Sequence, residues 1–315
     1  MVCVAVDGEG ARLCTASGDK VSTVYDSASG RKVMDFEHPD WLRACALSHD
    51  GKWLCTGCED AFVRLLEVDD ESDEPQPKLF EHGRAVNGVE FSHDDRLLMT
   101  ACNDKKVRVF DIAPPEPVEP MEGEEVELPP KPPTPDDDPF FKKKVVYPTP
   151  VLELRHDDGV QCARFSPDAT QIVTASGAAR FSGLARLWDR ETGGELGSFE
   201  VDDTATSASF SPDAMRICVS SRDKTARIFD IESGQELRGW QHSNFVTAAA
   251  FSADGKLVCT ACCDGYARVF DVQSRKEVRA LLHPDQVTCA VFGRGGAQLA
   301  TACRDAAVRI WGEVG

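Results

Sequence analysis

The sequence has no long apolar run and no excess of positive charge, and both absences limit what the protein can be. A transmembrane helix needs ~20 apolar residues, and no stretch here approaches that length or resembles a secretory signal. The net charge is −18 at pH 7, whereas binding to nucleic acid requires clustered Lys and Arg. We therefore expect a non-secreted protein of the cytoplasm or nucleus, with no membrane or nucleic acid among its partners.

Sequence motifs of enzymes are missing as well. There is no P-loop, no convergent set of metal ligands and no nucleophile with a neighbouring base. Thirteen cysteines without a signal peptide indicate a reducing compartment, and an odd number cannot all pair within one chain. We expect no enzyme activity, cofactor, metal or small-molecule substrate; a thiol enzyme is the alternative, and it would require an accessible cysteine of low pKa.

What the sequence does contain is a repeat. Seven segments end in a large apolar residue followed, in most copies, by an acid, and the intervals 26 to 67, 189 to 230, 230 to 271 and 271 to 312 are each 41 residues. Such a period is typical of a propeller blade, because one four-stranded sheet cannot bury both faces alone. The copies close at Asp26, Glu67, Asp111, Asp189, Asp230, Asp271 and Gly312.

The sixth copy predicts four strands, a to d, at residues 245–251, 256–261, 266–270 and 277–281. The turn between its first two strands contains Asp254 and Gly255, a favourable hairpin pair. The repeat therefore predicts a single all-β domain over residues 1–315. We expect a seven-bladed β-propeller of four-stranded antiparallel sheets.

Two Cys-x-x-Cys pairs, Cys55 with Cys58 and Cys259 with Cys262, occupy the same two places in the repeat. Other copies have Ser, Met, Val or Ala at these places, which indicates small core residues. Because residues three apart in a strand point to opposite faces, two such thiols would not converge on a metal. We interpret these cysteines as structural.

Further residues recur at fixed offsets: an Asp lies 22 residues after a His in four copies, and a hydroxyl residue lies four before that Asp. On these residues the sequence resembles the WD-repeat family, over nearly the whole chain outside one insertion. The resemblance implies a structural hydrogen-bonded relay of His, Ser or Thr, Asp and Trp in each blade, with no catalytic histidine. Only the last copy has all four relay residues, which are His283, Thr301, Asp305 and Trp311.

Several copies depart from this pattern. The fifth has Val201 and Val219 in place of the His and Thr, and the fourth loses the Asp through a longer turn near residues 177–183. Five copies replace Trp, mostly with Tyr or Phe, whose ring burial, roughly 1.5–3 kcal/mol, outweighs a lost indole bond of about 0.5–1.5 kcal/mol. We expect these blades to fold. An Arg recurs in strand c of every copy but the first, and we interpret it as a structural partner of neighbouring acids.

The main interruption of the repeat is residues 113–150, with twelve of the eighteen prolines. This stretch cannot bury enough apolar surface to fold by itself, so we expect a disordered Pro- and acid-rich insertion in the c–d loop of blade 3. It is either a spacer or a docking segment.

The ends of the sequence also break the pattern. The first copy begins at strand a, and the chain stops after Trp311 and before a last strand d. Two alternatives follow: the last blade has three strands and an exposed edge, or the chain is part of a longer protein. We favour the second.

The resemblance implies that partners bind at the rim of the ring, where loops present variable side chains. We expect a non-catalytic scaffold or adaptor that binds proteins or peptides there; the alternative is a recruiting or sensing domain of a larger enzyme or signalling protein. Trp41 and Phe245 are the expected anchors, because aromatic and Arg side chains dominate binding hot spots. The expected rim residues are Trp41, Arg43, Glu59, Asn87, Asn103, Gln161, Arg222, Phe245 and Arg304.

Overall fold

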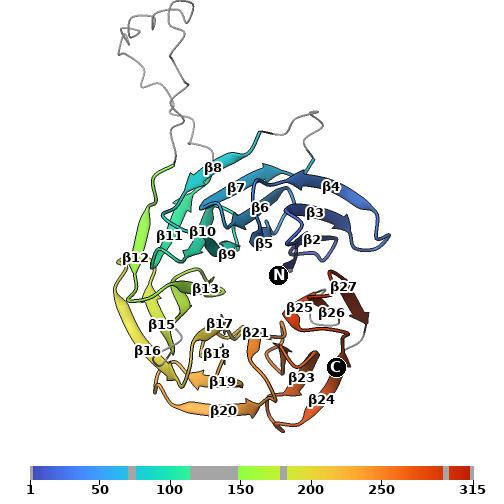
Figure 1. The fold of residues 1–315 in the computed structure, drawn as a ribbon. Helices are drawn as coiled ribbons and strands as arrows, with labels where there is room; N and C mark the ends of the chain where they lie inside the picture. The colour runs from blue at the N-terminus through green and yellow to red at the C-terminus, as the bar shows by residue number, and fades with distance from the viewer. Residues whose placement is uncertain (1–2, 70–75, 114–147, 178–182, 294–297, 313–315) are drawn as a thin grey trace, which may run out of the picture.

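The computed structural model describes residues 3–69, 76–113, 148–177, 183–293 and 298–312, which form seven antiparallel sheets in a ring (Figure 1). Six sheets have four strands and the last has three, so the prediction of a seven-bladed β-propeller is confirmed. Nearly all of the insertion expected at 113–150 lies outside the described residues.

Within every sheet the neighbours are consecutive strands of the chain. The first three blades contain β1 (Cys3–Val6), β2 (Arg12–Ala16), β3 (Val21–Asp26) and β4 (Lys32–Glu37); β5 (Leu42–Leu47), β6 (Trp53–Cys58), β7 (Phe62–Glu67) and β8 (Lys78–Glu81); β9 (Val86–Phe91), β10 (Leu97–Cys102), β11 (Lys106–Asp111) and β12 (Leu152–Arg155). The fourth and fifth contain β13 (Val160–Phe165), β14 (Gln171–Ser176), β15 (Gly183–Asp189) and β16 (Glu195–Val201); β17 (Ala205–Phe210), β18 (Arg216–Ser221), β19 (Thr225–Asp230) and β20 (Glu236–Gln241). The last two contain β21 (Val246–Phe251), β22 (Leu257–Cys262), β23 (Tyr266–Asp271) and β24 (Glu277–Leu282); β25 (Val287–Gly293), β26 (Gln298–Cys303) and β27 (Val308–Gly312).

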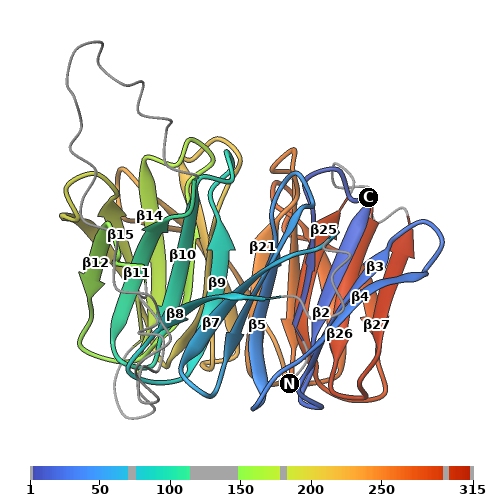
Figure 2. The same cartoon turned by 90° about the horizontal axis from the view of Figure 1, so that it is seen from above.

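Turn chemistry fixes the hairpin between the first two strands of a blade. In blade 6 the Ser252 hydroxyl donates to Asp254 Oδ1 at 2.7 Å and accepts the Leu257 N–H at 3.0 Å. Gly255 follows with φ +69°, a conformation that favours glycine. The inner strands, such as β5 and β9, run nearly along the axis of the ring, whereas outer strands such as β8 cross it obliquely, and the loops gather on its two faces (Figure 2).

The core lies between the blades. A bulky side chain on the outer strand of one blade packs on the strand-c aromatic of the next blade, as Phe80 does on Phe110, with ring centroids 4.8 Å apart. Phe199 with Phe229 and Trp240 with Phe270 repeat this contact at 5.4 and 5.0 Å. Burying each such ring contributes roughly 1.5–3 kcal/mol, so these contacts link neighbouring blades.

Blade 7 meets blade 1 along a seam that closes the ring. Val4 and Leu13 of blade 1 form a buried cluster with Ala300 and Ala302 of blade 7. The Cys289 thiol lies 3.6 Å from the carbonyl oxygen of Val4, 285 positions away. Within the described residues β27 is the outermost strand of blade 7, whereas β24 covers the outside of blade 6 (Figure 1).

Candidate protein-interaction rim

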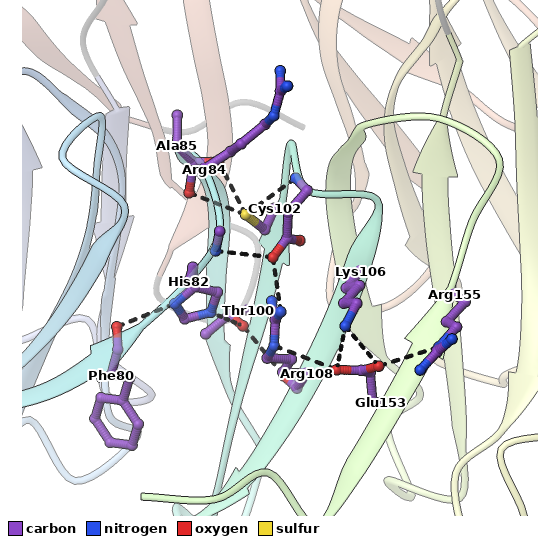
Figure 3. A network of polar contacts seen from close by, with 12 residues as sticks. Phe80, His82, Arg84, Ala85, Thr100, Cys102, Lys106, Arg108, Glu153 and Arg155 are labelled. Atoms are coloured by element: carbon purple, nitrogen blue, oxygen red, sulfur yellow. Dashed lines mark hydrogen bonds and ion pairs between the residues drawn. The ribbon is translucent and has the colours of Figure 1, made fainter. Parts of the chain in front are cut away.

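Blades 3, 4, 6 and 7 each contain a buried pair of His and Thr, which Figure 3 shows for blade 3. His82 lies in the loop between β8 and β9, with Nε2 2.8 Å from Thr100 Oγ1 and Nδ1 3.1 Å from the Phe80 carbonyl oxygen. Both residues are buried. Burial lowers the pKa of His82 to about 4, and the charge of Arg108 adds to the effect. The imidazole is therefore neutral at pH 7 and structural.

The turn aspartate of the same blade contacts an arginine. Asp104 accepts from Arg108 Nη2 at 2.7 Å and from the Gly83 N–H at 3.1 Å. Burial opposes ionisation of Asp104, yet the hydrogen bond from Arg108 keeps its pKa below the ordinary value. Arg108 Nε lies 3.7 Å from Glu153 on the outer strand (Figure 3). The strand-c arginine thus joins the turn to the outer strand.

In blade 7 the four expected relay residues form two groups. Thr301 Oγ1 lies 2.8 Å from His283 Nε2 and accepts from Trp311 Nε1 at 2.9 Å. Asp305 pairs with Arg309 at 2.6 Å, and this hydrogen bond lowers the pKa of the carboxyl well below its usual range. His283 Nδ1 lies 2.9 Å from the Leu281 carbonyl oxygen. The geometry joins His, Thr and Trp, and places Asp with Arg.

Blade 4 obtains the acidic partner of this arginine from another position, and blade 5 has a second acidic partner there. In blade 4, Arg186 pairs with Asp157, the residue after the loop histidine. In blade 5, Arg227 pairs with Asp202 at 2.6 Å as well as with Asp223 at 3.0 Å. Sequence reasoning missed Asp157 and Asp202; the signal was an acid directly after the His position.

The cysteines of the two Cys-x-x-Cys pairs pack as small core residues. Cys55, Cys58, Cys259 and Cys262 are buried, and burial raises the pKa of Cys259 to about 12 and of Cys262 to about 11. Cys262 lies 3.3 Å from the Asn244 carbonyl oxygen. Across the described ranges, no group of His, Cys, Asp and Glu side chains is arranged to hold a metal ion.

Four of the expected rim residues form one polar chain across blades 2 and 3. Arg43 donates through Nε to Glu59 at 2.7 Å and through Nη1 to Asn87 at 3.1 Å. Asn87 in turn donates to Asn103 at 2.7 Å. The guanidinium of Arg43 is therefore compensated by Glu59 and held in place. Because this side chain is already fixed, less conformational entropy would be lost when a partner contacts it.

A hollow of about 430 Å³ opens at this end of the channel, beside the polar chain. Arg43, Asn87, Gln161, Arg222 and Phe245 contribute to its wall, whereas the other four expected residues lie outside it. Phe245 is 43% exposed, and Trp41 is 59% exposed. Arg304 is exposed, with Nη1 3.3 Å from Gln286 Oε1. Both anchors predicted from the sequence, Trp41 and Phe245, are thus exposed. Five of the nine expected rim residues line one cavity.

Some positions at the rim connect the blades to one another. Asn87 Nδ2 donates to the Val160 carbonyl oxygen of blade 4 at 2.8 Å. The equivalent hydroxyls of Thr206 and Thr247 donate to carbonyl oxygens of the following blades at 2.6 and 2.8 Å. A substitution of Asn87 would therefore disturb the contact between blades 3 and 4 as well as the rim.

An ion pair in the channel was not expected from the sequence. Glu90 of β9 accepts from Arg164 of β13 at 3.4 Å and from the Phe165 N–H at 2.7 Å. Burial raises the pKa of Glu90, opposed by the charge of Arg164. Arg164 lies in the wall of the hollow together with Cys3 and Cys289. Alternate side chains of strand a point into the channel, and this alternation is the sequence signal that could have indicated the ion pair.

The described residues form no helix with the length and hydropathy of a transmembrane span. Six segments of the chain match the family model described as WD domain, G-beta repeat. They are residues 30–66, 73–111, 148–189, 194–230, 234–271 and 275–312. Each match runs from an outer strand to the end of strand c in the following blade.

Proposed function

Because this chain belongs to the WD-repeat family, whose propellers generally mediate protein–protein interactions, we propose that it is a non-catalytic scaffold or adaptor that binds a protein or peptide partner at the rim. One observation carries the proposal: exposed Phe245 and Arg222 share a 430 Å³ hollow with Arg43, whose side chain is held by neighbours. Rigid aromatic and arginine anchors beside a concavity are typical of interaction hot spots.

The charges of the rim favour one kind of partner. Arg43 is neutralised by Glu59, whereas Arg222 and Arg304 are exposed and form no ion pair with the described residues. Trp41 and Phe245 add two exposed apolar surfaces. A segment with acidic residues next to a bulky apolar side chain would complement this combination.

The test is affinity capture with the whole chain and the double variant Trp41→Ala/Phe245→Ala, side by side. Leu196→Ala, which changes another exposed apolar side chain on the outer strand β16, is the matched control. We expect the double variant to bind the captured partner with roughly 100-fold lower affinity, because each of the two hot-spot truncations costs about 1.4 kcal/mol or more of binding free energy. The control should bind as wild type.

Equal thermal melts of the three proteins would show that the rim variant is folded. Capture of the same partners by the double variant would reject the rim as the binding surface.

A further inference from the structure

One place in the first strand of every blade lines the 430 Å³ hollow and carries a small side chain. The backbone pairing identifies it, because the residue opposite it in the second strand is Ala, Gly or Ser in all seven blades. In chain order the residues at this place are Cys3, Ala44, Gly88, Cys162, Ser207, Ala248 and Cys289. Because blades 7 and 1 meet where the ring closes, Cys289 and Cys3 are two thiols of this set on adjacent blades.

The equivalent pair in blades 4 and 5 shows how close two such neighbours lie. Ser207 Oγ donates to Cys162 Sγ at 3.9 Å. The Cys162 thiol also lies 3.9 Å from the carbonyl oxygen of the residue that follows Ser207. In the same way, the Cys289 thiol lies 3.6 Å from the carbonyl oxygen of Val4, the residue that follows Cys3. Cys289 is therefore directed at Cys3 as Cys162 is directed at Ser207.

Cys3 has surroundings that stabilise a thiolate. The thiols of Cys289 and Cys45 are within hydrogen-bonding reach of it, and Arg164 places a guanidinium in the wall of the same hollow. The interactions with Cys289 and then Cys45 lower the pKa of Cys3 well below its usual range; burial opposes this and the charge of Arg164 adds to it. The pKa of Cys289 is raised by the interaction with Cys3 and by burial. Cys3 is thus the nucleophile of the pair, and Cys289 donates to it.

Both thiols of the pair can be reached from the hollow. Cys3 and Cys289 are partly exposed in its wall. Cys45 is only 5% exposed and packs in the core between blades 1 and 2. A small neutral oxidant such as a hydroperoxide fits a hollow of this volume, so it can approach Cys3 without opening the fold.

We propose that Cys3 and Cys289 form an oxidation site at which a hydroperoxide converts the two thiols to a disulfide between blades 1 and 7. The Cys3 thiolate attacks a peroxide oxygen, the O–O bond breaks, and the leaving oxygen takes up the proton that Cys3 released, which leaves a sulfenic acid at Cys3. The Cys289 sulfur then attacks Cys3 Sγ, the S–O bond breaks, and the hydroxide leaves as water with the Cys289 proton. The two sulfurs lose two electrons, and the peroxide gains them.

This disulfide would hold the seam of the ring closed. Val4, next to Cys3, and Cys289 are separated by 285 positions of the chain. A crosslink restricts the unfolded chain more when it encloses a longer loop, so this bond should stabilise the ring more than one between neighbouring strands. Reduction by small cellular thiols would reverse the closure.

The test oxidises the whole reduced chain with hydrogen peroxide and follows it on non-reducing denaturing gels. A bond between Cys3 and Cys289 encloses most of the chain in one loop, so the oxidised protein should migrate faster until dithiothreitol is added. Cys3→Ala and Cys289→Ala should each abolish this shift. Cys162→Ala is the matched control, because it removes a thiol at the same place in blade 4. All three variants should fold, since Ala44 and Ala248 occupy this place in blades 2 and 6.

Mass spectrometry of unreduced peptides identifies the bond. We expect a crosslinked pair of peptides that contain Cys3 and Cys289, and a dimedone adduct of sulfenic acid at Cys3 in the variant Cys289→Ala. A bond from Cys3 to Cys45, which encloses only a short loop, would overturn the assignment of the pair. Disulfides between two chains, or a gel shift that survives Cys289→Ala, would overturn it as well.

Alkylation by iodoacetamide tests whether Cys3 is the reactive thiol. Cys263 is the comparison, because it lines the same hollow and burial raises its pKa. At pH 7 Cys3 should react roughly 10-fold faster or more, since each unit of pKa changes the thiolate fraction about tenfold. In Cys289→Ala the pH profile of Cys3 should move to higher pH. Equal profiles for Cys3 and Cys263 would refute the proposal, and none of these measurements depends on a partner at the rim.

Discussion

Blades 5 and 7 fill the same interior space with opposite chemistry. In blade 5, Val201, Val219 and Phe229 pack in one buried apolar cluster. In blade 7 the equivalent residues are His283, Thr301 and Trp311, joined by hydrogen bonds of 2.8 and 2.9 Å. Both arrangements support strands in the same register.

The difference shows that the blade needs mutual satisfaction of its buried groups rather than a particular polar relay. An apolar set has no donor or acceptor to satisfy, and the polar set satisfies its own. A mixed set, in which one polar member has lost its partner, should be worse than either.

The largest expected effect is on the pH dependence of stability. Burial lowers the pKa values of His38, His82 and His156 to about 4, with the nearby arginines adding to the effect. Their pKa in the unfolded chain is about 6.5, so between these values the unfolded state binds more protons and stability falls as pH falls. We expect the free energy of unfolding to be nearly constant between about pH 7 and 8 and to decrease by several kcal/mol from there down to about pH 4.

Blade 5 provides the control for this effect, because it has no histidine at the position. The double variant His82→Val/Thr100→Val, which copies the blade 5 pair, should reduce the slope of unfolding free energy against pH in urea titrations. An unchanged slope would show that His82 does not contribute to the acid sensitivity.

The next effect comes from leaving one polar partner alone. Thr301→Val removes the oxygen shared by His283 and Trp311, and each unsatisfied buried group costs about 1–3 kcal/mol. Adding His283→Val and Trp311→Phe, the full apolar set of blade 5, should restore part of this loss in urea denaturation. If the triple variant were less stable than Thr301→Val alone, the rule drawn from the two blades would be wrong.

The smallest effect is expected for Trp311→Phe. It removes one hydrogen bond to Thr301 while retaining an aromatic ring, and should cost about 0.5–1.5 kcal/mol. In the Thr301→Val background the same substitution should cost less, because its acceptor is already absent. Equal costs in the two backgrounds would mean that the bond contributes nothing measurable to the free energy of unfolding.

Most of the fold could be predicted from the sequence, because each copy of the repeat corresponds to one blade. The strand expected at 245–251 is Val246–Phe251, and that expected at 277–281 is Glu277–Leu282. Contacts that cross between repeats were not predicted. The pair of Glu90 with Arg164 joins residues 74 positions apart in neighbouring blades. The pair of Arg186 with Asp157 lies within one copy and was missed because its acid is not at the usual turn position.

The rim was only partly predictable for a related reason. Exposure of Trp41 and Phe245 follows from their place in a loop beside strand a. The role of Asn87 does not, because its acceptor is a backbone carbonyl of Val160, and a carbonyl leaves no trace in the sequence. Side chains that bond to backbone atoms of the next blade therefore look like free rim residues until their acceptors are seen.

The seam between blades 1 and 7 has a consequence for the order of folding. Hairpins within a blade, such as β21 with β22, connect residues close in sequence, whereas Cys289 and Val4 are separated by 285 positions. The entropy of closing a loop rises with its length, so the seam should form last, after the blades that it joins. By the same reasoning it is the joint at which local opening, visible as faster amide hydrogen exchange, should begin.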